Sequence, residues 1–407
     1  MTKLLQIVVE GNRGSTGTIA ESIGELVLKQ GWKSYIAHGR FPRSSSSQII
    51  RIGSSLEILI HGITTRLFDR HGLGSCRATR VLIKKIEKIK PDIVHLHHLH
   101  GYYINIEILF NYLSNANLPT VWTFHDCWAI TGHCCYFDYV GCQKWKTNCH
   151  HCPQKKEYPA SLFIDRSKKN FYLKKKLFTS VSNMMIVTVS EWLDSIVGNS
   201  FLADTPRKII FNGVNVDLYK KTPLMKSQAT KKSLKIGDGF MILGVANTWE
   251  ERKGFNDFMR LSKRIGRNDF IVLVGLRKSQ IKNLPNNVIG IIRTESMEKL
   301  RDLYAAADVY LNLSVEETFG LTTAEALSCG TPAIVYNATA CPEVLDVNTG
   351  FVVNKNDIDG LLESIEGIRK NGKEFYSSQC RERAIKYYNR VDRLSEYLEM
   401  YKQMIAG

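Results

Sequence analysis

The spacing of two glutamates is the most informative feature of this 407-residue sequence. Glu317 and Glu325 are separated by seven residues, and Phe319, Gly320 and Leu321 lie between them. Apolar runs on both sides predict a strand, a glycine-containing loop, a short helix and a second strand. Backbone amides at a helix N-terminus suit a phosphate, and carboxylates accept hydrogen bonds from neighbouring hydroxyl groups. The pattern therefore predicts a nucleotide-sugar pocket in which the two carboxylates hold hydroxyls.

A simpler interpretation exists for both glutamates. Thr322 and Glu325 have the spacing of a capping box, in which the glutamate only completes the start of a helix. Glu317 would then be an ordinary loop carboxylate. The capping role and the ligand role of Glu325 do not exclude each other.

Basic and glycine-rich turns follow two other predicted strands. Arg252 and Lys253 come after an apolar run and open a helix, where two cations suit a diphosphate and its departure as a leaving group. Gly14 and Gly17 follow the first strand, and glycines there allow the backbone to approach a ligand closely. A solvated basic turn and an ordinary glycine turn are the alternatives.

Histidines gather after two strands in the first half of the chain. His125 and Asp126 end one strand-like run, and His98, His100 and Tyr102 follow another. In open α/β sheets, ligands bind at the carboxyl ends of the strands, so these residues are expected near a ligand. A metal site is conceivable among the histidines, but nearby carboxylates are sparse. We therefore favour acceptor binding or packing for His98, His100 and Tyr102.

Six of the ten cysteines fall between residues 127 and 152, and four of them have metal-site spacing. These four are Cys134, Cys142, Cys149 and Cys152, and the last pair is the Cys-x2-Cys of many zinc knuckles. We predict a structural zinc ion that holds an insertion at about 127–153 and contributes no chemistry. Free buried thiols and disulfides are the alternatives, and a reducing cytoplasm disfavours disulfides.

The elements that must position these motifs alternate between strand-like and helix-like patterns, which indicates parallel α/β layers. Strands are expected at 4–10, 34–38, 92–97, 121–125, 185–189 and 208–211, and then at 240–245, 270–275, 288–292, 309–313, 333–336 and 351–353. Residues 220–237 are polar and are interpreted as a linker. The predicted domains are residues 1–220 and 221–385, followed by a C-terminal helix at 386–407 that packs back on the first domain.

Composition and charge indicate a globular protein with a basic N-terminal half. Hydrophobic residues make up 44% of the chain and charged residues 23%, which is typical of a globular protein. No apolar run approaches the ~18 residues of a membrane span, and the apolar run at 4–9 is too short for a signal peptide. The first 220 residues hold 28 basic and 16 acidic residues, so most of the net charge of +16 lies there. A basic face suits nucleic acid, anionic lipid or an acidic substrate, but no nucleic-acid-binding motif is present.

Two segments combine basic and apolar residues. Phe and Tyr are interleaved with Lys and Arg at 161–178, and residues 56–70 are a second, weaker example. Such patterns suit an anionic membrane surface. A solvated basic face over core aromatics would give the same pattern.

The stretch from Glu317 through Phe319-Gly320 and Glu325 to Gly330-Thr331-Pro332 closely resembles the Glu-x7-Glu signature of family-4 retaining glycosyltransferases. The resemblance implies a GT-B fold, an α/β architecture of two Rossmann-like domains that face each other across a cleft. It implies that Glu317 holds donor-sugar hydroxyls, that Glu325 holds the ribose, and that the amides of Phe319, Gly320 and Leu321 meet the sugar and diphosphate.

The resemblance extends to other motifs. Lys253 matches the family's phosphate-binding lysine, but Thr248 stands where the family has an arginine, so Arg252 is expected to substitute. His125 is expected near the donor sugar, Gly14 and Gly17 near the donor phosphates and acceptor, and Arg293 near the nucleotide base.

The function implied is that of a retaining hexosyltransferase that needs no cofactor for catalysis. It would move a sugar from UDP or GDP to a lipid-linked or oligosaccharide acceptor in the synthesis of bacterial surface polysaccharide, of the O-antigen, capsule or colanic-acid type. The enzyme is expected in the cytoplasm, peripheral at the inner face of the cytoplasmic membrane, with an anionic membrane surface and no nucleic acid as partner. A zinc-knuckle nucleic-acid-binding protein and a GT-B nucleotide-sugar epimerase are the alternatives.

Overall fold

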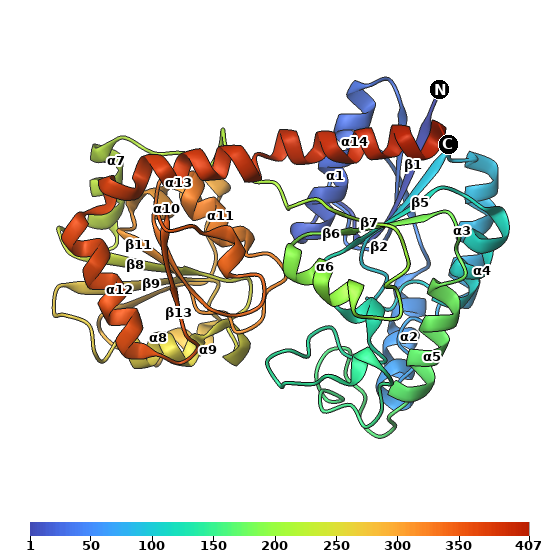
Figure 1. Ribbon diagram of the computed structural model, residues 1–407, viewed down its shortest axis with the longest axis horizontal. Helices are drawn as coiled ribbons and strands as arrows, with labels where there is room; N and C mark the ends of the chain where they lie inside the picture. The colour runs from blue at the N-terminus through green and yellow to red at the C-terminus, as the bar shows by residue number, and fades with distance from the viewer. Residues whose placement is uncertain (407) are drawn as a thin grey trace. The chain divides into compact units, whose positions relative to one another are not determined.

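A computed structural model describes residues 1–406 and divides the chain into two compact units (Figure 1). The first unit contains Met1–Ile210 and the C-terminal residues from Leu394 onward, and the second contains Phe211–Arg393. The sequence analysis had placed these boundaries after residues 220 and 385. The segment after Ile210 belongs to the second unit because the Tyr219 carbonyl accepts hydrogen bonds from Ser328 and Arg381.

The first unit is built on a seven-stranded parallel sheet with the order β3-β2-β1-β4-β5-β6-β7. Its strands are β1 (Lys3–Glu10), β2 (Lys33–Arg40), β3 (Gln48–Arg51), β4 (Ile93–Leu96), β5 (Thr120–Phe124), β6 (Met184–Thr188) and β7 (Arg207–Ile209). Its helices are α1 (Gly14–Lys29), α2 (Ser55–Phe68), α3 (Cys76–Ile89), α4 (Ile106–Ala116), α5 (Ser167–Phe178) and α6 (Glu191–Gly198). The six strands predicted here are present. The edge strand β3 was missed because it is short and mostly exposed, so its residues show no alternation.

The last helix, α14 (Arg390–Ala406), completes the core of the first unit. Tyr397 and Tyr401 pack in the same buried cluster as Leu4 of β1. The Tyr401 hydroxyl lies 2.6 Å from His95 Nδ1, and the Tyr397 hydroxyl lies 3.3 Å from Thr123 Oγ1. The helix therefore fixes the strands β4 and β5, at whose carboxyl ends the predicted histidine site lies.

The second unit has a six-stranded parallel sheet with the order β10-β9-β8-β11-β12-β13. Its strands are β8 (Phe240–Val245), β9 (Asp269–Val274), β10 (Val288–Ile291), β11 (Val309–Asn312), β12 (Ala333–Tyr336) and β13 (Gly350–Val353), all predicted from the sequence. Its helices are α7 (Leu224–Ser233), α8 (Phe255–Leu261), α9 (Lys278–Ile281), α10 (Met297–Ala306), α11 (Leu321–Ser328), α12 (Ile358–Asn371) and α13 (Lys373–Tyr388). Helix α7 occupies the segment interpreted as a linker. It buries no residue and is held by Lys231, whose Nζ lies 2.6 Å from Asp308 Oδ2.

The chain between β5 and α5 contains only two single-turn 3-10 helices, η1 (Trp128–Ile130) and η2 (Lys144–Lys146). It nevertheless buries the large side chains of Trp128, Phe137 and Trp145. The cysteine-rich insertion thus has a core of its own without strands or long helices.

Within residues 1–406, no helix combines the length and the apolar composition that a membrane span requires.

Candidate functional site

The predicted loop and helix around Gly320 are present at the end of β11. Gly320 has a φ of 94°, a conformation that favours glycine, and it directly precedes α11. The Phe319 side chain is buried against the rings of Phe211 and Tyr388, with centroids 6.2 and 5.5 Å away. The Phe319 side chain is therefore not accessible to a ligand at the helix N-terminus, and only the backbone of this residue can contact one.

Glu317 is paired with Lys253, so the structure brings together two residues that the sequence assigned to the donor. The Lys253 ammonium donates a short hydrogen bond to Glu317 Oε1, and both side chains are about one-fifth exposed. Ser314 Oγ donates to the same carboxylate oxygen at 3.2 Å. The hydroxyl of Thr339 accepts from the Glu317 amide and donates to the Glu317 carbonyl, each at 2.8 Å. The backbone of Glu317 is thus fixed while its carboxylate keeps some exposure.

Close backbone packing brings the basic turn to the acidic loop. Gly254 has a φ of 75°, and a Cβ there would lie only 2.3 Å from the Leu313 carbonyl oxygen. The Val315 amide donates to the Arg252 carbonyl at 2.9 Å, and Arg252 Nη1 donates to the Glu316 carbonyl at 2.9 Å. Arg252 therefore supports the loop as well as adding positive charge beside Lys253.

Glu325 is held by two tyrosines that the sequence analysis did not identify. Tyr304 donates to Glu325 Oε2 at 2.9 Å, and Tyr219 also hydrogen-bonds to this carboxylate. Burial raises the pKa of Glu325 to about 7, although the two tyrosines oppose the shift. Tyr219 and Tyr304 are far from Glu325 in sequence, and neither belongs to a recognisable motif.

The capping-box interpretation of Glu325 is wrong. The residue that caps α11 is Gly320, and no side chain makes a capping hydrogen bond there. Thr322 instead uses Oγ1 to accept a hydrogen bond from Tyr310 at 2.7 Å. The Glu325 carboxylate is therefore not used to start the helix.

The other residues assigned to the donor are not part of this hydrogen-bonded group. Arg293 is exposed in the turn after β10, and no hydrogen bond links it to Lys253 or Glu317 in the described chain. Gly14 and Gly17 lie in the first unit at the start of α1. A Cβ at Gly17 would lie 2.4 Å from the Glu10 carbonyl oxygen, so this glycine allows α1 to begin close to the end of β1.

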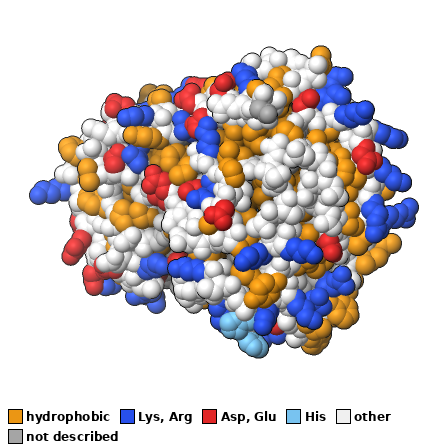
Figure 2. Space-filling model, turned by 45° about the vertical axis from the view of Figure 1, so that its right-hand side comes forward, with side chains coloured by type: hydrophobic (Ala, Val, Ile, Leu, Met, Phe, Trp, Pro, Cys, Tyr) orange, Lys and Arg blue, Asp and Glu red, His pale blue; other side chains and the backbone are white. Residues whose placement is uncertain are grey.

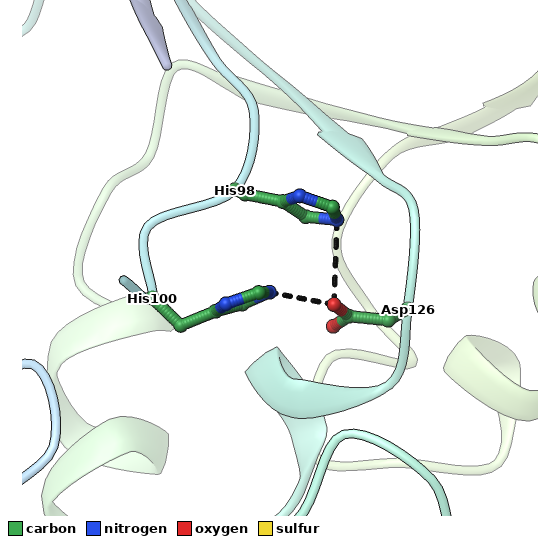
Figure 3. Close-up of side chains that lie close together, drawn as sticks. All are labelled: His98, His100 and Asp126. Atoms are coloured by element: carbon green, nitrogen blue, oxygen red, sulfur yellow. Dashed lines mark hydrogen bonds and ion pairs between the residues drawn. The ribbon is translucent and has the colours of Figure 1, made fainter. Parts of the chain in front are cut away.

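A second group of polar side chains lies in the first unit, at the ends of β4 and β5. Figure 3 shows the imidazoles of His98 and His100 directed at one carboxylate oxygen of Asp126. His98 Nε2 lies 3.3 Å and His100 Nε2 lies 2.6 Å from Asp126 Oδ2. The three ligand atoms lie within 4.8 Å of one another, so the group has the geometry to bind a metal ion or the hydroxyls of a substrate.

Each member of this cluster is oriented by another residue. Thr16 Oγ1 lies 3.3 Å from His98 Nδ1, and the Tyr158 hydroxyl lies 3.1 Å from His100 Nδ1. Burial disfavours the charged form of Asp126, but the two histidines and the amide of Trp128 outweigh it and hold the pKa of this carboxyl well below its usual range. Burial lowers the pKa of His98 to about 4. Asp126 is therefore an anion beside a neutral His98 at physiological pH.

His125 borders the cluster, while Tyr102 contacts it indirectly. His125 Nε2 lies 3.3 Å from His97 Nδ1, and burial lowers the pKa of His125 well below its ordinary value, so its ring is neutral. Tyr102 packs edge-on against Tyr158, which in turn contacts His100. The neighbouring His95 and His97 are buried, with 0% and 1% of their surface exposed.

Similarity to known proteins covers nearly the whole chain. The family model described as "Glycosyltransferase Family 4" matches residues 20–218, and "Glycosyl transferases group 1" matches residues 239–371. "Putative colanic acid biosynthesis glycosyl transferase WcaC" of Escherichia coli is 24% identical over 378 residues, which cover 88% of this chain and 89% of that protein.

Two solved structures show the same fold over the full length of the chain. Sucrose-phosphate synthase from Thermosynechococcus elongatus matches with a TM-score of 0.74 at 16% identity and covers all of both chains. Anabaena HepE in complex with UDP-glucose matches with a TM-score of 0.68 at 14% identity and covers 99% of this chain and 100% of that chain.

Two parallel α/β units, with a basic turn and an acidic loop joined at the carboxyl ends of β8 and β11, define a glycosyltransferase of the GT-B fold. The two family matches narrow the assignment. The chain belongs to the family-4 glycosyltransferases, and it is an enzyme of that class.

Proposed function

We propose that this glycosyltransferase moves a sugar from a nucleoside diphosphate to a saccharide acceptor during polysaccharide assembly, with retention of anomeric configuration. The observation that carries the proposal is the Lys253–Glu317 pair beside the Gly320-led N-terminus of α11, with Glu325 on the same helix. The similarity to the colanic-acid glycosyl transferase supports the polysaccharide setting.

In the donor site, each charged group has a distinct partner. Lys253 binds the diphosphate and stabilises the charge that develops on it as it leaves. The Glu317 carboxylate accepts hydrogen bonds from hydroxyls of the transferred sugar, and Glu325 accepts from the ribose. The amides of Gly320 and Leu321 add the partial positive charge of the helix N-terminus. Because these groups supply the positive charge, the chemistry requires no metal ion.

The nucleotide is UDP or GDP, and a uridine nucleotide is the first to test. The complex of HepE with UDP-glucose supports this order, since that protein has the same fold. Arg293, exposed in the turn after β10, is the residue we assign to the nucleotide end of the donor.

The acceptor binds in the first unit at the His98–His100–Asp126 cluster. Asp126 is an anion with two aligned imidazoles, an arrangement that can accept a hydrogen bond from a sugar hydroxyl and orient it. His125, neutral and adjacent, faces the reacting sugar in this proposal. Gly14 and Gly17 allow α1 to bring Thr16 to His98.

Retention follows from attack on the same face as the leaving group. A double displacement needs a free carboxylate as nucleophile, and Asp126 is already bound by His100 and by the Trp128 amide. The leaving phosphate can accept the proton of the incoming hydroxyl in a same-face reaction. An inverted anomeric linkage in the product, read by NMR coupling constants, would refute this part of the proposal.

A lipid-linked acceptor is supported by an apolar stripe on the outside of α2. The stripe has helical spacing, and its members are between 36% and 64% exposed: Leu56, Leu59, Ile60, Ile63 and Leu67. Only His61 and Thr65 of this helix are buried. A helix in a soluble domain normally turns such a stripe inward, so this face suits a membrane surface or the lipid of the acceptor.

The two segments that the sequence marked for membrane binding lie side by side. The Leu162 amide donates to the Arg66 carbonyl at 2.8 Å, which places the exposed Phe163 next to the end of α2. The same two segments carry exposed basic residues, namely Arg66, Arg70, Lys168, Lys169, Lys175 and Lys176. In Figure 2, hydrophobic and basic side chains lie next to one another along the lower right of the face shown. Apolar insertion combined with positive charge favours anionic lipid.

The decisive experiment measures nucleotide binding by thermal shift. The wild type, Glu325→Ala and Glu363→Ala are each tested with a panel of UDP, GDP, ADP, CMP and TDP-sugars. A ligand at 100 times its dissociation constant should stabilise the protein by about 2.7 kcal/mol. We expect one diphosphate to stabilise the wild type, with a much smaller effect on Glu325→Ala.

The Glu363→Ala variant is the matched control, because Glu363 is an exposed residue on α12 in the same unit. It should bind the nucleotide as the wild type does. No stabilisation by any nucleotide would refute the donor site, and conversion of the sugar without an acceptor would favour an epimerase.

A further inference from the structure

The segment from Cys127 to Arg166 is held together by something other than regular secondary structure. It is far longer than an ordinary connection, and it contains only the two single-turn helices η1 and η2. Long loops without secondary structure are uncommon in compact domains unless they have a function or are cross-linked. The insertion is nevertheless well packed, with Phe137 and Trp145 stacked at a centroid distance of 5.0 Å.

Four cysteines from different turns of this segment line one small cavity. They are Cys134, Cys142, Cys149 and Cys152, and all four are free thiols. The thiols of Cys134 and Cys152 are close enough to influence each other's pKa. The two residues are separated by seventeen others in sequence, so the fold itself has brought these thiols together.

Backbone amides already point at two of the sulfurs. The Gly132 amide donates to Cys149, and the Gln154 amide donates to Cys152. Amide donors stabilise sulfur when it carries negative charge, and metal-bound cysteines commonly have such partners. The Cys149-x2-Cys152 turn thus has the surroundings of a metal-binding knuckle.

Two buried groups beside the cavity lack the partner that a metal–thiolate cluster would provide. Lys174 is 2% exposed, and its ammonium donates to the neutral carbonyls of Trp128 and Thr131, at 2.6 and 3.0 Å, and lies 3.5 Å from the centroid of the Trp128 ring, so none of these partners carries a negative charge. His133 lines the same cavity. Its Nδ1 donates to Asp69 Oδ1 at 2.6 Å, and its buried Nε2 has no hydrogen-bond partner. An anionic cluster would compensate the buried ammonium and accept a hydrogen bond from the imidazole.

We propose that Cys134, Cys142, Cys149 and Cys152 bind one structural Zn²⁺ ion as a closed tetrahedral site. Binding converts the four thiols to thiolates and releases their protons to solvent, which leaves a cluster of net charge about −2. Among residues 1–406, the only group with three possible ligand atoms within 4.8 Å of one another is His98, His100 and Asp126. The four cysteine sulfurs are therefore farther apart than a metal site requires, and these side chains must rotate about their Cα–Cβ bonds to bind the ion.

The zinc site has a structural consequence for the acceptor cluster. Tyr158, which hydrogen-bonds to His100, belongs to the same segment as the four cysteines. The Cys152 amide also donates to Asp165 at 2.7 Å, just before α5 begins. The ion therefore positions Tyr158 and the start of α5 without touching a substrate.

The test is metal analysis of the full-length protein purified without chelators. We expect about one zinc per chain in the wild type, as a single four-cysteine site requires. Cys142→Ser and Cys149→Ser should each lose most of this zinc, whereas Cys76→Ser, which removes an exposed thiol outside the segment, should keep it. A wild type without zinc, or variants that retain it, would overturn the proposal.

Two measurements on the wild type keep the test decisive if the serine variants do not fold. Cobalt exchanged into the site should give the visible bands of tetrahedral Co²⁺ with four sulfur ligands, and a mercurial reagent should release the metal in step with thiol modification. A spectrum with a nitrogen ligand would overturn the four-cysteine assignment and point to His133. Cysteines that react only after reduction would establish disulfides instead.

Discussion

Replacement of Glu325 by glutamine should stabilise the protein and weaken donor binding. Burial raises the pKa of Glu325 from 4.5 to about 7, so the folded state holds the proton more tightly than the unfolded state. The free energy of unfolding therefore falls as the pH rises from about 4.5 to about 7. The difference in pKa corresponds to about 3 kcal/mol once the pH is above 7.

Glutamine keeps the shape of the protonated acid and can still accept the hydrogen bond from Tyr304. In denaturant titrations, Glu325→Gln and the wild type should differ by about 1 kcal/mol at pH 5 and by about 3 kcal/mol at pH 8, with the variant more stable at both. Glu363→Gln changes an exposed carboxylate in the same unit and should show no such trend. An equal stability difference at pH 5 and pH 8 would refute the reasoning.

Binding should change in the opposite direction. Only the ionised carboxylate accepts from both ribose hydroxyls, and a pKa of about 7 leaves roughly a tenth of Glu325 ionised at pH 6. Calorimetric titration should show that the donor affinity of the wild type rises from pH 6 to pH 8. This rise should be about tenfold larger than the rise measured for Glu325→Gln over the same pH range. Parallel pH profiles for the two proteins would contradict a ribose role for Glu325.

Four further predictions test the rest of the mechanism. Lys253→Ala should lower kcat by about 10²- to 10³-fold, because it removes the positive charge that stabilises the leaving diphosphate. A change in donor affinity with no change in kcat would contradict this role. Asp126→Asn should raise the KM for the acceptor while the Kd of the donor nucleotide stays unchanged, and weakened nucleotide binding would be inconsistent with an acceptor site. Rates with and without added Mg²⁺ or Mn²⁺ should agree, since protein groups carry the positive charge; a strict requirement for either ion would show the donor site to be incomplete. Ile60→Gln combined with Ile63→Gln should reduce sedimentation with anionic vesicles and leave nucleotide binding intact, and undiminished sedimentation would exclude α2 as the contact.

The sequence predicted the sheets well because both are parallel and buried. Strands that are covered on both faces become continuous apolar runs, and twelve of the thirteen strands were predicted; the edge strand β7, with residues that are only partly buried, is an exception to this burial. Two of the elements that were missed lack this signal. β3 is an exposed edge strand, and α7 buries no residue, so neither shows a periodic apolar pattern.

The candidate site was predictable where its residues belong to short local motifs, such as the Arg252-Lys253 turn and the acidic loop. Glu317, Gly320 and Glu325 lie in one stretch, and their arrangement follows from a loop and a helix start. Tyr304 and Tyr219 reach Glu325 from other elements, and no local pattern marks them. The sequence marked residues 56–70 as a segment that suits a membrane surface, but helical periodicity shows that an apolar face exists and not which way it points, so the exposure of the α2 stripe came from the structure.

The ion pair between Lys253 and Glu317 determines what kind of molecule can occupy the donor pocket. The two side chains neutralise each other, so a ligand that offers only negative charge must detach Lys253 and leave the carboxylate without a counter-charge. A nucleotide sugar replaces both partners at once, because its diphosphate takes the ammonium and its hydroxyls take the carboxylate. If Lys253 and Glu317 hold the donor as proposed, inorganic phosphate should be a poor competitor, and the nucleotide that remains after transfer should be held less tightly than the donor. The same contact would then disfavour small anions and help the spent nucleotide to leave.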